Sequence, residues 1–236
     1  PYDELGVTGF GVAESVDAAA QHLGRETSRL SVAIQGFGAV GAATARRLAE
    51  LGATVVAVST ARGGVYDSDG LDVDELLRLR TEHGDDLVDH IPSARRLAAG
   101  EELTVQADVL VPAALQDVID GDLAAHIRAD IVVEGANLPT GRRAQQVLAG
   151  RGVTVVPDVI ANAGGVVAAA VAMDSRTSGL RPDTGAVFDS ISTKLRSGVG
   201  QTLRDAADRG TTTHEAAVHN ARVRVHEAMR LKGRLA

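Results

Sequence analysis

The sequence predicts an α/β fold in which helices cover both faces of a doubly wound, mostly parallel sheet. Short apolar runs typical of strands alternate with stretches of helical periodicity, which is the pattern of parallel strands joined by crossover helices. A glycine-rich sequence between the first strand and the following helix is the second observation. Residues 171–236 carry no strand signal and are expected to be helical. We therefore expect one domain, with a leading helical segment at about 1–27, an α/β core at 28–170 and a helical tail at 171–236.

The core strands are predicted from apolar runs bounded by turn-forming residues. These runs lie at residues 30–35, 53–59, 108–112, 131–134 and 153–157. Between the first two, Val40, Thr44 and Leu48 form one apolar stripe of helical spacing, and Gly52 is a natural stop after it. This order gives the strand–helix–strand unit from which the rest of the sheet is built.

Further helices are predicted at residues 12–23, 73–80, 144–148 and after Gly164. The tail is expected to break near residues 179–182 and again around Gly210. Thr213, followed by His214, Glu215 and Ala216, resembles a capped helix start.

Composition excludes several classes of partner. Hydrophobic residues make up 44% of the chain, which is enough for an ordinary core, but aromatic residues make up only 2% and leave no platform for stacking nucleic-acid bases. The net charge of −7 disfavours a polyanionic partner. Because there is no cysteine, disulfides and thiolate metal sites are excluded. No run approaches the roughly 18 consecutive apolar residues of a membrane span. We expect a cytoplasmic protein that binds neither nucleic acid nor membranes.

The glycine-rich sequence predicts a dinucleotide-binding turn of the Rossmann type. It comprises Gly36, Phe37, Gly38, Ala39, Val40 and Gly41, directly after the first strand and at the start of the first core helix. Gly36 would allow a tight turn, Gly38 would let the backbone approach a pyrophosphate, and Gly41 would let the helix pack closely on the strand. The helix N-terminus would then bind the phosphates. Since the spacing alone arises by chance, this context carries the prediction, and a glycine-rich turn that binds nothing is the alternative.

The end of the second strand bears on the choice between NAD and NADP. An NAD site usually places a carboxylate there to bind the ribose 2′-hydroxyl, but this sequence has Ser59, Thr60 and Arg62, and Asp67 and Asp69 come too late. These three residues could bind a 2′-phosphate instead. The alternative is that Arg62 is simply a solvated loop residue. We therefore favour NADP slightly over NAD.

Five ordered motifs resemble one protein family. They are VTGFGV at 7–12, IQGFGAVG at 34–41, VPAA at 111–114, EGANLPT at 134–140 and PDVIANAGGV at 157–166. Their order and spacing are similar to the C-terminal NAD(P)-binding domain of the glutamate/leucine/phenylalanine/valine dehydrogenases.

The resemblance implies roles for individual residues. Thr8 would reach the nicotinamide region, and Ala113 and Ala114 would line the crevice at the strand ends. Asn137 would lie near the nicotinamide ribose, and Asn162 would orient the carboxamide and face the substrate. An amide suits these roles because it donates and accepts hydrogen bonds at once. Without the resemblance, either asparagine could be a turn or helix cap, and for Asn162 the two roles can coexist.

The resemblance also implies a reaction. An amino acid would be oxidatively deaminated to a 2-oxo acid and ammonia, with hydride transfer to NAD(P). The family's catalytic Lys and Asp lie in a preceding substrate domain that this sequence lacks, and the only lysines, Lys194 and Lys232, lie in the helical tail. We therefore assign no catalytic residue, and expect the isolated chain to be inactive and to meet its amino-acid substrate only together with that domain. Glutamate-specific members often place a serine where residues 166–170 are apolar, which leaves the substrate open.

Other interpretations remain. A stand-alone NAD(P)-binding sensor or scaffold is the alternative function, and the resemblance also allows a homo-oligomer. His214, His219 and His226 share no i, i+4 pair, so no metal site is assigned. The acidic stretch at 83–90 and the pair Arg95–Arg96 are predicted to be solvated surface.

Overall fold

In the computed structural model, which describes residues 5–178 and 183–233, a seven-stranded sheet has the order β4-β3-β2-β1-β5-β6-β7. The strands are β1 Ser31–Gln35, β2 Thr54–Thr60, β3 Gly63–Tyr66, β4 Arg95–Leu97, β5 Val109–Pro112, β6 Ile131–Val133 and β7 Thr154–Val156. Strands β2, β1, β5, β6 and β7 run parallel. Strand β3 pairs antiparallel with β2, and β4 pairs antiparallel with β3. The predicted α/β fold with a mostly parallel sheet is confirmed.

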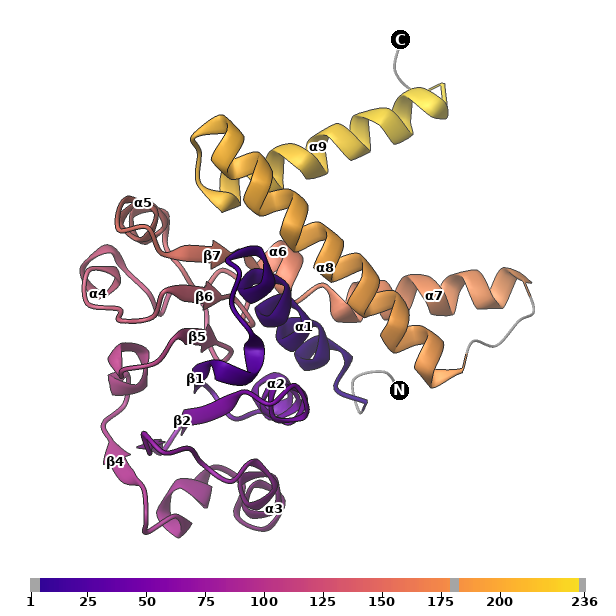
Figure 1. Cartoon of the computed structure of the whole chain (residues 1–236). Coiled ribbons are helices and arrows are strands. Elements are labelled where there is room, and N and C mark those ends of the chain that lie inside the picture. The colour runs from indigo at the N-terminus through magenta and orange to yellow at the C-terminus, as the bar shows by residue number, and fades with distance from the viewer. Residues whose placement is uncertain (1–4, 179–182, 234–236) are drawn as a thin grey trace.

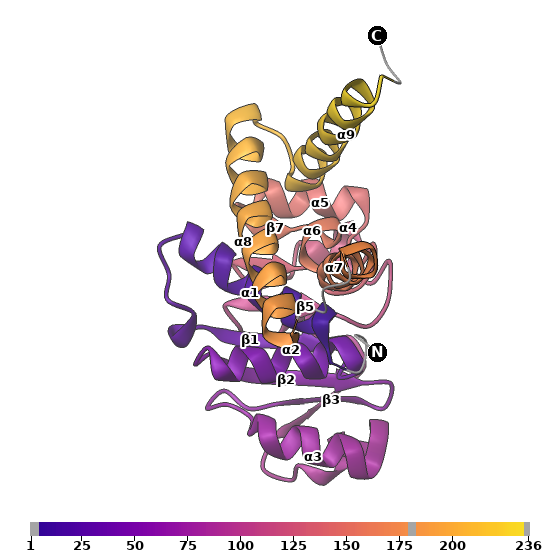
Figure 2. The same cartoon turned by 90° about the vertical axis from the view of Figure 1, so that its right-hand side faces the viewer.

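Helices cover both faces of this sheet, as Figures 1 and 2 show. The α-helices are α1 Val7–His22, α2 Ala39–Glu50, α3 Val73–His83, α4 Gly121–Ala124, α5 Arg142–Gly150, α6 Asp158–Ala161, α7 Gly164–Ser178, α8 Thr184–Arg209 and α9 Thr213–Leu231. Three short 3-10 helices are η1 Thr27–Arg29, η2 Gly84–His90 and η3 Glu101–Thr104. Helices α1, α2 and α3 lie on one face, and η3, α4 and α5 lie on the other.

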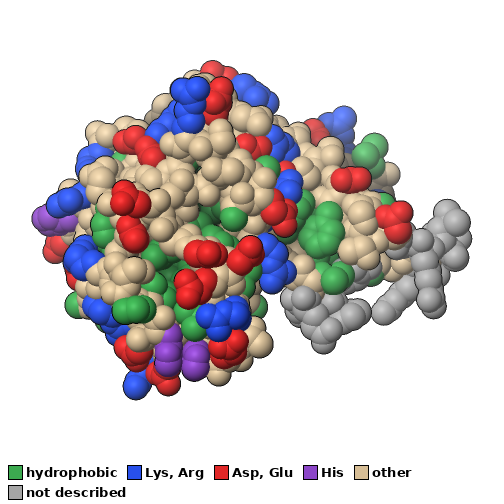
Figure 3. Space-filling model, turned by 60° about the horizontal axis from the view of Figure 1, so that its bottom comes forward, with side chains coloured by type: hydrophobic (Ala, Val, Ile, Leu, Met, Phe, Trp, Pro, Cys, Tyr) green, Lys and Arg blue, Asp and Glu red, His purple; other side chains and the backbone are tan. Residues whose placement is uncertain are grey.

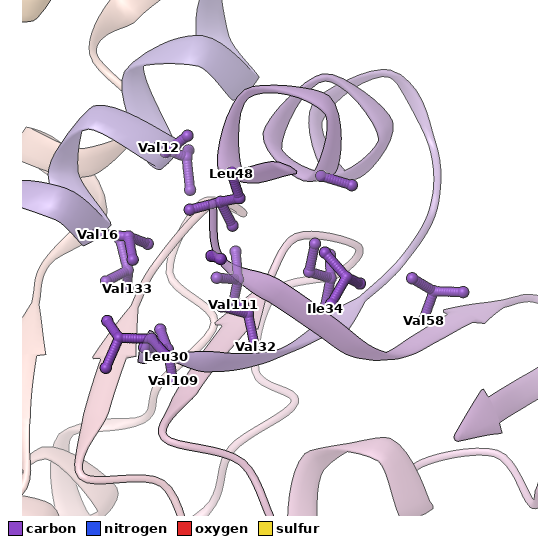
Figure 4. Close-up of a cluster of buried hydrophobic side chains, with 14 of the residues drawn as sticks. Val12, Val16, Leu30, Val32, Ile34, Leu48, Val58, Val109, Val111 and Val133 are labelled. Atoms are coloured by element: carbon purple, nitrogen blue, oxygen red, sulfur yellow. The ribbon is translucent and has the colours of Figure 1, made fainter. Parts of the chain in front are cut away.

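The core sits on both sides of β1, because successive side chains of a strand point to opposite faces. Val32 and Ile34 face α1 and α2, where they meet Val12 and Leu48 (Figure 4). Ala33 belongs to the cluster on the opposite face. All five side chains are at most 1% exposed. The continuous burial of this strand explains why its sequence is apolar throughout rather than alternating.

Glycines in two of the motifs allow helices to pack with their backbones in contact. A Cβ atom on Gly9 of α1 would lie 2.4 Å from the carbonyl oxygen of Val40 in α2. A Cβ atom on Gly164 of α7 would lie 2.2 Å from the carbonyl oxygen of Val7 in α1. These close approaches bring the first turns of α1, α2 and α7 to the same end of the sheet.

The tail helix α8 is fixed to this core by buried charge. Glu14 of α1 is 2% exposed and pairs with Arg47 of α2 at 2.9 Å and with Arg196 of α8 at 3.1 Å. Removing one partner of such a group would leave a buried charge unpaired. Helix α9, in contrast, buries only Ala216 and Ala217 fully.

A second charged group, at Asp108, connects the segments that lead into β1 and β5. Asp108, just before β5, accepts hydrogen bonds from the amide of Ser31 at 2.8 Å and its hydroxyl at 2.6 Å, and pairs with Arg25. Burial opposes the charge of this carboxylate, but the hydrogen bonds from Ser31 and Arg25 outweigh burial and hold the pKa of Asp108 below its ordinary value.

Several element predictions need correction. Strands β3 and β4 were not predicted, because Gly63 and Gly64 have weak strand propensity and the charged pair Arg95–Arg96 gives no apolar run; β3 forms by pairing with β2, and β4 by pairing with β3. The leading helix begins at Val7 rather than at residue 12, and the last helix is capped by Thr212, one residue before the expected start. The break at Gly210 is confirmed, whereas the break predicted near 179–182 lies outside the described residues.

Among the described residues, one stretch that the sequence analysis did not single out is apolar and long enough to cross a membrane by length and composition. This stretch, Asp158–Ser175, has a mean hydropathy of 1.2, and 28% of it is buried inside the protein. It comprises α6, a turn at Asn162 and most of α7, and Ala168 within it is fully buried against α8. We assign it to the fold, and a cytoplasmic location stays a prediction.

The surface at the α3 end carries charges of both signs. Figure 3 shows acidic and basic side chains interspersed over this face, with apolar side chains between them. His83 and His90 stack here with ring centroids 3.7 Å apart. Among the described residues in this view, basic side chains alternate with acidic ones.

Candidate functional site

The candidate site lies where the strand order reverses, between β1 and β5. Strands β2, β3 and β4 extend the sheet on one side of this point, and β6 and β7 extend it on the other. The chain continues from β1 into Gly36 and from β5 into Ala113, whose amide donates to the carbonyl of Gln35 at 2.8 Å. In open α/β sheets, ligands bind outside the carboxyl ends of the strands at such a reversal.

The three glycines of the turn after β1 differ in what a side chain at each position would meet. Gly36 has φ +89°, and a Cβ atom there would lie 2.6 Å from the Cβ atom of Ala114. A Cβ atom on Gly41 would lie 1.9 Å from the carbonyl oxygen of Gly36. At Gly38, in contrast, a Cβ atom would meet nothing within 4 Å. Gly36 and Gly41 are thus required by the fold, whereas Gly38 presents bare backbone to open space.

The N-terminus of α2 is prepared for an anion. The first N–H groups of an α-helix, here those of Ala39, Val40 and Gly41, have no partner within the helix. Gly38 provides no side-chain cap, and the first turn holds no acidic residue. These free donors and the positive end of the helix dipole favour a phosphate group.

Ser59, near the end of β2, accepts hydrogen bonds from two amides of this turn. The amide of Gly36 donates to the Ser59 hydroxyl at 3.0 Å, and the amide of Phe37 donates to the Ser59 carbonyl at 2.7 Å. The hydroxyl itself donates to Oε1 of Glu102 at 3.0 Å. Ser59 is 4% exposed, and the Phe37 ring is 1% exposed in the core.

These contacts correct part of the sequence hypothesis. The hydroxyl of Ser59 is buried and donates to Glu102 inside the fold instead of facing a 2′-phosphate, and both the ring and the amide of Phe37 are used within the fold. Glu102 was not singled out, because nothing in the sequence distinguishes it from the neighbouring Glu101, which is solvent-accessible.

The end of β2 opens into a hollow of about 460 Å³ where charges of both signs meet. Arg62, with its side chain 64% exposed, pairs with Asp86 at 2.9 Å. Arg96 pairs with Asp89 at 3.1 Å and donates to the carbonyl of Arg62 at 3.4 Å. Thr60 donates its hydroxyl to the carbonyl of Asp85 at 2.7 Å. The antiparallel β3–β4 pair and η2 thus bring to this point residues that the sequence analysis had placed on unrelated surface.

A larger cavity of about 770 Å³ lies on the other side of the reversal point. It brings together six of the predicted site residues, namely Thr8, Val40, Ala113, Ala114, Asn137 and Asn162. Inside it, Nδ2 of Asn162 donates to Oδ1 of Asn137 at 2.8 Å. The two amides therefore act as one polar group, with further donor and acceptor atoms left for a ligand.

Backbone strain accompanies this pair of asparagines. Leu138, next to Asn137, has φ +48°, a conformation that bulky residues rarely adopt. Its amide donates to Oδ2 of Asp158 at 2.8 Å, which holds the loop in place. Such strain persists only where the surroundings enforce it, and it concentrates at functional sites.

A buried pair beneath the same loop connects it to α9. Glu134, 1% exposed, accepts the amide of Asp158 at 2.9 Å and contacts Nε2 of His214 at 2.9 Å. His214 thus has a carboxylate partner rather than a second histidine. In the part of the chain that the structure describes, no group of three side chains is arranged to hold a metal ion.

The lining of the larger cavity contains no titratable side chain among the described residues. Its polar groups are amides, one hydroxyl and backbone atoms. Lys194 lies on α8 and Lys232 directly follows α9, away from the lining. The cavity can therefore bind and orient a ligand, but its own side chains cannot take up or release a proton near neutral pH.

Comparison with known proteins gives matches to a family model and to several dehydrogenases. A family model described as glutamate/leucine/phenylalanine/valine dehydrogenase matches residues 2–233. A glutamate dehydrogenase of Thermotoga maritima is 47% identical over 160 residues, which are 67% of this chain and 38% of that enzyme. An NADP-specific glutamate dehydrogenase of Saccharolobus shibatae is 40% identical over 80% of this chain and 43% of its own length. An NAD-specific glutamate dehydrogenase of Clostridioides difficile is 33% identical over 96% and 54%, respectively.

A solved structure agrees with these matches. The hetero-hexameric glutamate dehydrogenase of Thermus thermophilus, in its Leu-bound form, superposes with a TM-score of 0.85 at 33% identity. The match covers 98% of this chain and 54% of that one. The chain thus spans about half the length, or less, of the proteins that it matches.

Proposed function

Because the chain belongs to the glutamate/leucine/phenylalanine/valine dehydrogenase family, we propose that it is the NAD(P)-binding domain of an amino-acid dehydrogenase. A dinucleotide would lie across the reversal point of the sheet. Its pyrophosphate would bind the amides at the start of α2, and its nicotinamide would enter the cavity lined by Thr8, Asn137 and Asn162. The observation that carries the proposal is the open backbone at Gly38, placed at an uncapped helix N-terminus between two cavities.

The residues of this chain would orient the cofactor. The amide pair Asn137–Asn162 would bind the nicotinamide carboxamide and ribose, while Ala113 and Ala114 would form the apolar wall of the crevice. When bound, the cofactor would accept a hydride from the α-carbon of the amino acid, and water would hydrolyse the resulting imine to a 2-oxo acid and ammonia. Deprotonation of the amine and hydrolysis of the imine need proton transfer, and the described lining of the cavity supplies no titratable side chain for it.

Catalysis is therefore proposed only for this chain together with a substrate-binding domain. The relatives that it matches extend well beyond the matched part, and such a domain would contribute the acid–base residues and bind the amino acid. On its own, the chain would bind the dinucleotide without turnover. Assembly into a homo-oligomer is part of the same proposal.

NADP is proposed as the preferred cofactor. Arg62 and Arg96 converge on the hollow at the end of β2. A 2′-phosphate there would replace Asp86 and Asp89 as partner of the two guanidinium groups, which bind phosphate well. The opposite preference would use Asp86 as acceptor for a ribose 2′-hydroxyl, and both cofactor specificities occur among the relatives.

Titration of the 236-residue chain with NADPH and NADH, followed by nucleotide fluorescence, tests the proposal. We expect saturable binding of both, with tighter binding of NADPH. Arg62→Ala should weaken NADPH binding about tenfold, which is about 1.4 kcal/mol, and leave NADH unchanged. Arg95→Ala is the matched control, since Arg95 pairs with Glu101 outside the hollow lining. Tighter NADH binding would refute the preference, and no binding of either nucleotide at millimolar concentration would refute the function.

The second candidate function is a non-catalytic dinucleotide sensor or scaffold. It is favoured because the described lining of the cavity has no titratable side chain. The reading frame upstream of Pro1 separates the two. A continuous frame of at least about 150 residues, a typical domain length, that includes a lysine-bearing substrate domain supports the dehydrogenase. Deamination assays of that longer protein should compare L-glutamate with L-leucine, since Val166 at the cavity is 73% exposed and apolar.

A further inference from the structure

Glu102 is a buried carboxyl group that neither the motifs nor the proposed cofactor contacts account for. It lies on η3 and is 4% exposed. Its Oε1 atom accepts the hydroxyl of Ser59 at 3.0 Å, whereas its Oε2 atom is buried without a hydrogen-bond partner among the described residues. A buried polar atom without a partner is costly. Glu102 is therefore a candidate for a role beyond packing.

The bond to Glu102 determines what the Ser59 hydroxyl can do. A hydroxyl group has one hydrogen to donate and lone pairs with which to accept. Because that hydrogen points to Glu102, the oxygen is free to accept the amide of Gly36 at 3.0 Å. The Ser59 carbonyl accepts the next amide, that of Phe37, at 2.7 Å.

Two consecutive amides of the turn are thereby fixed inward, and those that follow remain free. With Gly36 and Phe37 held by Ser59, the N–H groups from Gly38 onward are the first without a partner in the fold. These are the donors to which a pyrophosphate would bind. Their direction depends on the inner pair, since the tight turn leaves little freedom between them.

From this geometry we propose that Glu102 is a positioning residue for dinucleotide binding, acting through Ser59 on the glycine-rich turn. It touches no ligand. It sets the donor direction of one hydroxyl and so the orientation of the backbone that meets the pyrophosphate. The proposal rests on the proposed function, because it assumes that a dinucleotide binds at α2.

A set of variants of the 236-residue chain tests this role, with NADPH affinity as the readout. Glu102→Leu keeps much of the volume and removes the acceptor, and Ser59→Ala removes the hydroxyl. We expect each to raise the Kd for NADPH about tenfold, or 1.4 kcal/mol. Glu102→Gln retains a carbonyl acceptor for Ser59 and should bind within about threefold of the wild type. Glu101→Gln, the same change at the neighbouring residue, should leave the Kd unchanged.

The double variant Ser59→Ala/Glu102→Leu separates positioning from general loosening. If Glu102 acts through Ser59, the double variant loses no more than either single variant, whereas independent effects would multiply to about a hundredfold. Amide hydrogen exchange at Gly36 and Phe37 should accelerate in each single variant, and this readout, with Ser59→Ala, also decides the matter if Glu102→Leu fails to fold.

The outcomes also separate this proposal from the function itself. Wild-type affinity in folded Glu102→Leu, unchanged exchange at Gly36 and Phe37, or multiplicative losses would each overturn the role of Glu102. Failure of the wild-type chain to bind either NADPH or NADH would instead overturn the proposed function.

Discussion

Two glycines only three residues apart should respond to alanine in opposite ways. At Gly41, a Cβ atom would lie 1.9 Å from the backbone oxygen of Gly36 and 3.3 Å from Cγ2 of Ile34. Neither neighbour can yield easily, because the oxygen belongs to a turn held by Ser59 and the methyl group lies in the core. Overpacking of this kind costs about 1–3 kcal/mol, and contact with backbone belongs at the upper end.

At Gly38, alanine should leave the fold unchanged and impair binding. The residue has φ −84°, which alanine adopts readily, and a Cβ atom would meet nothing within 4 Å. Loss of glycine at a helix N-cap costs up to about 1 kcal/mol, and the lower entropy of the unfolded chain returns about 0.4–1 kcal/mol. The net change in unfolding free energy should be close to zero. The added methyl group would, however, stand between the helix amides and a pyrophosphate.

Urea unfolding and NADPH titration of the same two proteins give the comparison. We expect Gly41→Ala to lose about 3 kcal/mol of unfolding free energy. Gly38→Ala should retain wild-type stability while its Kd for NADPH rises at least about tenfold. If Gly38→Ala binds NADPH as tightly as the wild type, the pyrophosphate does not approach this backbone, and the placement of the dinucleotide is refuted.

Three further perturbations probe the surrounding structure. Asp108→Asn should lower the free energy of unfolding at neutral pH. The pKa of Asp108 is depressed in the folded state. The stability that its carboxylate contributes is therefore complete above its unfolded pKa of about 3.9 and is lost as the pH falls through the lower folded pKa. The stability gap between wild type and variant should therefore close below about pH 4, and a gap independent of pH in urea titrations would contradict the assignment. His214→Ala leaves the buried Glu134 without its side-chain partner and should cost about 1–3 kcal/mol, with faster amide exchange in the first turn of α9; unchanged exchange there would show that the pair does not anchor this helix. Gly164→Ala should destabilise by about 1–3 kcal/mol, whereas the control Gly150→Ala, with open space around its Cβ position, should not; equal thermal stability of the two would speak against backbone contact between α1 and α7.

What could be predicted from the sequence were features with a local signal. The five parallel strands were predicted because each is a short apolar run. The turn after β1 was predicted because its glycines stand at fixed offsets that backbone geometry requires. The likeness of ordered motifs placed Thr8, Asn137 and Asn162 at one cavity although they are far apart in the chain.

What could not be predicted depends on pairing between distant segments. Arg96 reaches the carbonyl of Arg62 across 34 positions, because the antiparallel β3–β4 pair returns the chain to the end of β2. Glu102 reaches Ser59 across 43 positions. Neither residue has a periodicity or neighbour that reports its burial, and Ser59 was therefore assigned to a phosphate that its hydroxyl does not face.

The sheet terminates on a three-residue strand at each side, β4 and β7. Such short borders offer few free backbone groups to an incoming strand, and Arg95 and Arg96 add like charge along β4. Edge-to-edge aggregation is therefore disfavoured by the short edge strands and the charge on β4. A second copy of the chain would therefore find no long strand edge to extend, whereas α9 presents Val225 and Leu231 to solvent, 56% and 90% exposed.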